Sequence, residues 1–151
     1  MLKPFSLQPL LNLAQYQNES ATRKLGFLNK QQQTEQQKLD TLLEYRKDYQ
    51  SRLQSASQSG MDQAKLRNFQ LFINKLDEAI NQQTSLVEHS KVSTNVGRSE
   101  FNTTQRKLKS FDTLQQRHFE AQNKITIKDE QKIQDEHTGR QVAHKIINAE
   151  N

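Results

Sequence analysis

Residues Ser55-Ala56-Ser57-Gln58-Ser59-Gly60-Met61-Asp62 form the one cluster of small and helix-breaking residues before the far end of the chain. Gly60 can adopt the positive φ that a tight turn needs, because it has no Cβ. Ser59 or Asp62 can cap a helix that begins after the cluster. The sequence therefore predicts that the chain turns back on itself at about residues 57–62.

Apolar side chains recur on both sides of this turn with alternating gaps of four and three residues. The positions on this lattice before the turn are Leu7, Leu11, Ala14, Asn18, Ala21, Leu25, Leu28, Gln32, Glu35, Leu39, Leu42, Arg46, Tyr49, Leu53 and Ala56. After the turn they are Leu66, Phe69, Ile73, Leu76, Ile80, Gln83, Val87, Ser90, Thr94, Gly97, Phe101, Thr104, Leu108 and Phe111. A spacing that averages 3.5 residues keeps one stripe on one side of a helix, as a coiled-coil seam requires. Two such helices joined by a short loop run antiparallel.

We therefore expect an all-α fold, a long antiparallel two-helix coiled coil in one domain (residues 1–151) with a longer, overhanging second helix. The first helix should cover about residues 6–56, capped by Ser6 and with Pro9 in its first turn. The second should cover about residues 63–138, break at Gly139 and be followed by a short segment at about 140–150. Residues after Phe111 should overhang the first helix.

Centring the turn on Ser59 and Gly60 pairs residue i with roughly residue 119 − i, which places Arg46 opposite Ile73 and Ala21 near Gly97. Polar residues dilute the middle of the seam, so hydrogen exchange should be faster there than near Leu42 and Leu76. The polar lattice positions are Gln32, Glu35, Gln83, Ser90 and Thr94.

The composition agrees with few, long helices. The chain has 151 residues, a net charge of +5, four glycines, two prolines and no cysteine. Only 32% of its residues are hydrophobic, too few to fill the core of a multi-layer fold. The scarcity of glycine and proline favours helix over disorder. Without cysteine there are no disulfides, and no apolar run approaches the roughly 20 residues of a membrane span. We expect a cytoplasmic protein.

Chemistry of an enzyme is not apparent in the sequence. There is no glycine-rich phosphate loop and no nucleophile beside a base, and the four histidines His89, His118, His137 and His144 are scattered. We therefore expect no catalytic residue, no cofactor and no metal site. Basic residues alternate with acidic ones except for a mildly basic stretch over residues 98–109, so a nucleic-acid partner is not favoured.

Extra apolar residues lie beside the seam near the turn. Tyr45, Phe72 and Ala79 each immediately precede a lattice residue, and a two-helix seam does not need them. With Leu42, Tyr49 and Leu76 they widen the apolar surface on one flank. They can form an exposed docking surface or simply close over the seam, and residue types alone do not separate these interpretations.

Three stretches in order carry a family resemblance. They are Leu39-Asp40-Thr41-Leu42-Leu43-Glu44-Tyr45-Arg46-Lys47-Asp48-Tyr49, the segment Asn68-Phe69-Gln70-Leu71-Phe72-Ile73-Asn74-Lys75-Leu76-Asp77-Glu78-Ala79-Ile80 after the turn, and Leu108-Lys109-Ser110-Phe111-Asp112-Thr113-Leu114-Gln115. Together with Ala21-Thr22-Arg23-Lys24-Leu25-Gly26, the sequence resembles the FliJ family of flagellar type III export proteins, which are similar to the central stalks of rotary ATPases.

The resemblance implies a monomeric, non-catalytic stalk, cytoplasmic and peripheral to the inner membrane, that links the ring of the export ATPase FliI to the export gate FlhA and escorts export chaperones. It implies that the gate binds Leu42, Tyr45, Tyr49, Phe72, Leu76 and Ala79. Lys38 and Gln83 stand where the family has a glutamine and a histidine, so their part in gate binding is less certain. We further expect the ATPase ring to contact the open end of the hairpin, at Leu7, Leu10, Leu11, Leu108 and Phe111. The alternatives are a generic coiled-coil scaffold, a stalk of another rotary-type ATPase and, third, a nucleic-acid-binding rod.

Overall fold

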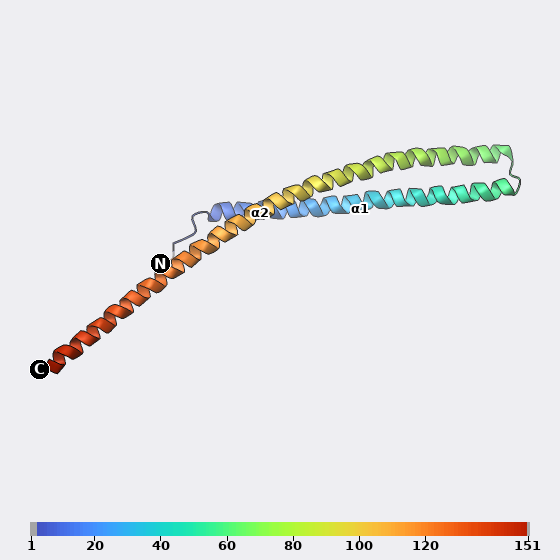
Figure 1. Ribbon diagram of the computed structural model, residues 1–151. Coiled ribbons are helices and arrows are strands. Elements are labelled where there is room, and N and C mark those ends of the chain that lie inside the picture. The colour runs from blue at the N-terminus through green and yellow to red at the C-terminus, as the bar shows by residue number, and fades with distance from the viewer. Residues whose placement is uncertain (1–2, 151) are drawn as a thin grey trace. The chain divides into compact units, whose positions relative to one another are not determined.

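Two helices make up nearly all of the protein. The computed structural model describes residues 3–150, with α1 at Gln8–Gln58 and α2 at Gln63–Glu150. The described residues contain no strand, and α1 and α2 pack against each other as a hairpin (Figure 1). The prediction of an all-α helical hairpin with a longer second helix is confirmed.

The turn between the helices is closed by backbone hydrogen bonds. Gly60 has a φ of 79°, in the left-handed region that favours glycine. The Met61 N–H donates to the Ala56 carbonyl at 3.1 Å and the Gly60 N–H donates to the Ser57 carbonyl at 3.4 Å, which is the bonding pattern of a Schellman motif. Asp62 stands at the cap of α2, where its carbonyl accepts the first helical bond from Leu66. These bonds reverse the chain where the sequence predicted it.

The start of α1 differs slightly from the prediction. The helix begins at Gln8, and Ser6 lies in the turn before it. The Leu7 carbonyl accepts the first helical bond from Leu11, so Leu7 and not Ser6 occupies the cap position. Pro9 lies in the first turn, where a missing N–H leaves no helical bond unmade.

The helix seam follows the lattice read from the sequence. Every lattice position from Leu7 to Ala56 and from Leu66 to Phe111 is buried or half-buried. The most deeply buried apolar side chains include Leu11, Ile73 and Val87. A spacing of 3.5 residues therefore describes the packed face of both helices.

Contacts across the seam follow the predicted pairing at some positions and depart from it at others. Gln83 bonds to Glu35 and Tyr49 packs against Phe69, each within one residue of the predicted partner. Arg46 donates from Nε to Asp77, one helical turn beyond the expected Ile73. Gly97 packs against Leu28 and Leu25 and not against Ala21. A long side chain such as that of Arg46 can reach along the seam, past the residue opposite it.

Two features of the predicted second helix are wrong. First, α2 continues without a break through Gly139 to Glu150, so there is no separate segment at about 140–150. One glycine inside a helix costs only about 1 kcal/mol, which the helix formers around it offset. Second, the exposed overhang begins after Gln122 and not after Phe111, since Lys3 and Phe5 continue alongside α2 as far as Gln122.

The contacts divide the chain into two compact units. One is Asn18–Thr104, which contains the turn; the other combines the described residues up to Gln17 with those from Gln105 onward. Each unit contains one piece of α1 and one piece of α2. Their behaviour as one domain stays a prediction. Neither α1 nor α2, over the described residues, has a stretch apolar enough to cross a bilayer.

Candidate docking site

The six residues predicted to form an apolar surface on one flank of the seam all lie in the unit Asn18–Thr104. We call them the docking strip. Its members are Leu42, Tyr45, Tyr49, Phe72, Leu76 and Ala79. Leu76 is buried in the seam, whereas Leu42, Tyr49 and Ala79 are half-buried. Tyr45 is 53% exposed and Phe72 is 41% exposed, so both residues keep a large part of their surface open to water.

Aromatic packing holds the centre of the docking strip. The Tyr49 ring lies 4.4 Å from the Phe72 ring and 6.1 Å from the Phe69 ring, measured between centroids. The Arg52 guanidinium lies over the Tyr49 ring at 5.6 Å from its centroid, a cation–π distance. Tyr49 is itself fixed by its place in the seam. Phe72 is therefore an exposed ring with a supported position, which lowers the entropy lost when a partner binds it.

One edge of the docking strip is a polar cluster. The Gln83 side-chain amide donates to the Glu35 carboxylate at 2.6 Å and to the Glu35 carbonyl at 2.9 Å. The Lys38 ammonium lies 3.7 Å from the same carboxylate. Gln83 is only 8% exposed, so it is committed to the seam, whereas Lys38 is exposed. Lys38 and Gln83 were the two positions whose part in binding was less certain. Of these, only Lys38 presents its side chain to a partner.

A shallow groove accompanies this edge of the docking strip. Its volume is about 450 Å³. The groove is lined by Thr34, Gln37, Lys38, Thr41, Leu42 and Gln83. Because Leu42 belongs to both, the groove and the docking strip form one continuous surface.

Sequence reasoning missed Leu86. It is 51% exposed and follows Ala79 by seven residues, as Ala79 follows Phe72. Residues seven apart lie on nearly the same face of a helix. The heptad spacing of these three positions was the available signal. Leu86 therefore extends the apolar line of the docking strip along α2.

The residues expected to face an ATPase ring lie in the other unit, and most of them are core residues. Leu11 is almost fully buried, and Leu7, Leu108 and Phe111 are half-buried. Only Leu10, which is 47% exposed, offers most of its side chain to a partner. The sequence brought these positions to one end of the hairpin but did not separate seam from surface.

Phe5 and His118 complete the core of this unit, and neither was predicted. Phe5 is 8% exposed and its ring lies 5.6 Å from the His118 ring. His118 Nε2 is 2.9 Å from the Lys3 carbonyl. Because His118 extends the lattice of α2 by seven residues beyond Phe111, its spacing was a usable signal. Phe5 carried none, since it precedes α1.

The end of α2 is a second accessible surface. Every residue over 123–150 is exposed, including several large aliphatic side chains. These are Ile125, Ile127, Ile133, Val142, Ile146 and Ile147. A helix that is exposed on all sides gains no stability from tertiary packing. This segment is therefore suited to folding stably against a partner.

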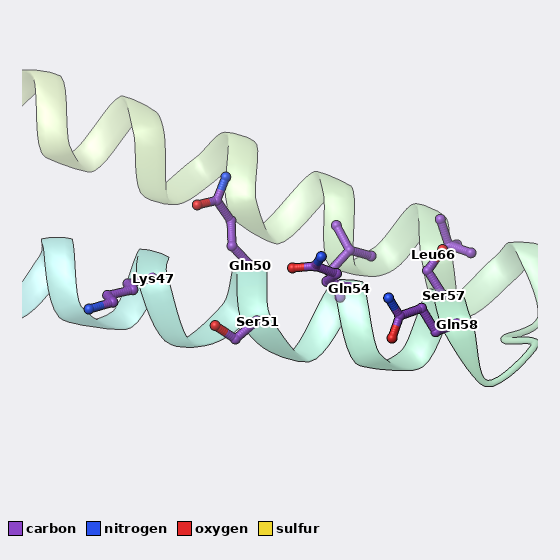
Figure 2. A pocket seen from close by; sticks show the side chains of 8 residues that line it. Lys47, Gln50, Ser51, Gln54, Ser57, Gln58 and Leu66 are labelled. Carbon is purple, nitrogen blue, oxygen red and sulfur yellow. The ribbon is translucent and has the colours of Figure 1, made fainter.

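A shallow pocket near the turn has a mixed polar and apolar lining (Figure 2). It has a volume of about 620 Å³. Its lining consists of Lys47, Gln50, Ser51, Leu53, Gln54, Ser57, Gln58 and Leu66. Apart from Lys47, Leu53 and Leu66, the lining consists of amide and hydroxyl side chains. Among residues 3–150 no cluster of three His, Cys, Asp or Glu side chains could hold a metal ion.

Comparisons with known proteins agree over nearly the whole length. The family model described as "Flagellar FliJ protein" matches residues 3–146. The chain is 26% identical over 140 residues to the Flagellar FliJ protein of Escherichia coli (strain K12), covering 93% of this chain and 95% of that protein. It has the same identity and coverage with the Flagellar FliJ protein of Salmonella typhi. The matched region includes the docking strip.

Proposed function

Because the chain belongs to the flagellar FliJ protein family, we propose that it is the non-catalytic stalk and adaptor that links the export ATPase ring to the export gate. Family membership makes it a component of the flagellar export machinery, with protein partners in that machinery. The ATPase FliI, the gate FlhA and the export chaperones are the partners we propose. We also propose peripheral association with the inner membrane through the gate.

The exposure of Tyr45 and Phe72 is the observation that carries this proposal. Exposed rings also occur elsewhere, as at Phe27, but Tyr45 and Phe72 are grouped with further apolar residues on one flank of the seam. A grouped apolar surface of this kind indicates a place for a partner. Aromatic anchors dominate the binding energy of protein interfaces. The ring of Tyr49 supports Phe72 from below, as a binding surface needs. We assign the docking strip to the export gate.

The ATPase ring and the chaperones take the remaining accessible surface in this proposal. Leu10 and residues 123–150 belong to the unit that lacks the docking strip. Their large aliphatic side chains are exposed and accessible to a partner. Two separate surfaces in two units are what an adaptor with two partners requires.

The test replaces both exposed rings, as Tyr45→Ala with Phe72→Ala, and measures binding to the cytoplasmic region of the export gate by a pull-down and by calorimetry. We expect affinity for the gate to fall at least about tenfold, since anchor residues contribute about 2 kcal/mol or more. Helicity and binding to the ATPase should not change, because both positions flank the seam.

Phe27→Ala is the matched control. Phe27 lies in the same unit and is 67% exposed, but it is not part of the docking strip. Loss of gate affinity in this control, or equal loss of gate binding, ATPase binding and helicity in the double variant, would contradict the assignment. The free chain should sediment as a 17.6 kDa monomer; a stable dimer would favour a generic coiled-coil scaffold.

A further inference from the structure

Basic side chains continue the lines on which the exposed rings lie. On α1, Lys38 precedes Tyr45 by seven residues and Arg52 follows it by seven. On α2, Lys65 precedes Phe72 by seven residues. Residues at heptad spacing share a helix face, so each ring is flanked by positive charge along its own helix.

Lys75 adds charge to the side of the docking strip. It follows Phe72 by three residues and precedes Ala79 by four, which are the spacings of neighbours on a helix surface. Lys65 and Lys75 are both exposed, and neither has an ion pair with any residue over 3–150. These two ammonium groups are free to pair with a partner.

Some carboxylates near the docking strip are already engaged by other side chains. Asp48 lies 3.4 Å from Arg52, and Glu35 is bonded to Gln83 and lies near Lys38. Glu78 follows Lys75 by three residues and Asp62 precedes Lys65 by three, so each is close to its lysine along the chain, but neither forms an ion pair with it.

Two basic side chains elsewhere on the same hairpin are paired within the chain. Arg46 bonds to Asp77, and Lys91 lies 3.4 Å from Glu88. Lys47 and Arg67, among others, have no ion pair with residues 3–150 either, so Lys65 and Lys75 are distinguished by their place beside the apolar line.

The apolar line itself has the spacing of a helix partner. Phe72, Ala79 and Leu86 recur every seven residues over two heptads, or about 21 Å of helix. An amphipathic helix laid along this line presents its own apolar side chains at the same interval. An extended strand would not, because its side chains alternate every two residues.

We propose that the docking strip binds an acidic amphipathic helix, packed along Phe72, Ala79 and Leu86 with its carboxylates on Lys65 and Lys75. This inference rests on the proposed docking of the export gate at the same strip, and it names the chemistry of the segment that docks. The hydrophobic contact supplies most of the affinity, and the lysines supply the preference for an acidic partner.

Two synthetic peptides test the proposal directly. Each has about three heptads with the same leucine stripe, and the flanking positions are glutamate in one and lysine in the other. Binding to the full chain is followed by fluorescence anisotropy. The glutamate peptide should bind at least about tenfold more tightly at low salt, and the difference should shrink as salt screens the charges. Equal binding, tighter binding of the lysine peptide, or no binding of either peptide would overturn the proposal.

Charge-reversal variants identify the residues responsible. Lys65→Glu with Lys75→Glu should remove the preference for the glutamate peptide, and Phe72→Ala should weaken the binding of both peptides. Lys47→Glu with Lys91→Glu makes the same change in net charge away from the docking strip and should leave the preference intact. If this control lowers the preference as much as the first pair, overall charge and not the rim selects the peptide, and the proposal is wrong.

An experiment with the export gate distinguishes the proposed function from the acidic-helix proposal. If the gate region does not bind the wild-type chain but the glutamate peptide does, the proposed function fails while the helix preference stands. If the gate region binds and Lys65→Glu with Lys75→Glu leaves its affinity unchanged, the gate assignment stands and the acidic-helix proposal fails. Competition between the peptide and the gate region, with a loss of both in the double lysine variant, supports both.

Discussion

Gly97 of α2 lies so close to Leu28 of α1 that a Cβ on the glycine would be 2.5 Å from the Leu28 Cδ1 atom. Next to it, Thr94 is only 2% exposed and its hydroxyl is 2.8 Å from the Ser90 carbonyl and 3.3 Å from the Leu28 carbonyl. Small side chains at these positions therefore let α1 and α2 approach closely in the middle of the unit Asn18–Thr104.

Gly97→Ala is expected to be less stabilising than the same change elsewhere in the chain. Alanine favours a helix over glycine by up to about 1 kcal/mol, but the new methyl group must displace Leu28 in a packed seam. Gly26→Ala is the matched control, because its Cβ would meet nothing within 4 Å. Urea unfolding followed by circular dichroism should show a higher midpoint for Gly26→Ala and an unchanged or lower midpoint for Gly97→Ala.

The double variant Gly97→Ala with Leu28→Ala checks the cause. If the clash with Leu28 is responsible, the cost of Gly97→Ala should be smaller in the Leu28→Ala background, as expected for residues in contact. Equal stabilisation by Gly97→Ala and Gly26→Ala would show that the seam at Gly97 accommodates a methyl group freely.

Arg46→Leu is expected to stabilise the hairpin. Arg46 occupies a seam position that prefers an apolar side chain, and its partner Asp77 is exposed enough to be solvated when the arginine is removed. The urea midpoint should rise for Arg46→Leu and change little for Asp77→Asn. A lower midpoint for Arg46→Leu would show that the ion pair is worth more than an apolar contact.

The same pair should leave stability independent of pH near neutrality. The hydrogen bond from Arg46 to the Asp77 carboxylate raises the pKa of Arg46 above its ordinary value. A base whose pKa is raised in the folded state contributes its stabilisation at low pH. This contribution is lost only as the pH rises through the raised pKa. The effect of Arg46→Leu should therefore be the same at about pH 6 and at about pH 9. A difference between the two would mean that another group titrates with the pair.

The fold could be predicted from the sequence because its signals are local. The 3.5-residue period fixes which face of each helix is buried, and Gly60 fixes where the chain turns. The partner of an individual side chain was less predictable, because a long side chain can reach along the seam. Arg46 bonds to Asp77 although Ile73 was expected opposite it, whereas Gln83 and Glu35 meet close to the predicted pairing.

The candidate site could be predicted where its residues follow the 3.5-residue period. It could not be predicted where it depends on how deeply each side chain is buried. Tyr45 and Phe72 were recognised because they precede lattice residues, but their exposure needed the packed structure. Leu10 and Leu11 are adjacent in sequence, yet one is exposed and the other is core. Phe5 lay beyond prediction, since it packs on α2 from outside either helix.

Two truncations should separate the packed part of α2 from its overhang. A chain that ends after Gln122 keeps every contact of α2 with residues 3–17, so its melting temperature should equal that of the full chain. A chain that ends after Phe111 loses His118, the ring partner of the buried Phe5, and should melt at a lower temperature. Both should lose the ring and chaperone binding that we assign to residues 123–150. Equal melting of the two chains would show that Phe5 contributes nothing to stability.

Hydrogen exchange should be slow in the middle of the seam, contrary to what its polar residues indicate by type. The expectation of fast exchange assumed that polar seam positions weaken packing. In the structure Gln83 bonds to Glu35, Thr94 is almost fully buried, and no buried side-chain polar atom over residues 3–150 lacks a partner. Satisfied polar groups do not carry the cost of buried unpaired ones. Deuterium uptake measured by mass spectrometry should therefore be no faster over residues 83–97 than around Leu42 and Leu76; faster uptake there would show that residue type outweighs the observed burial.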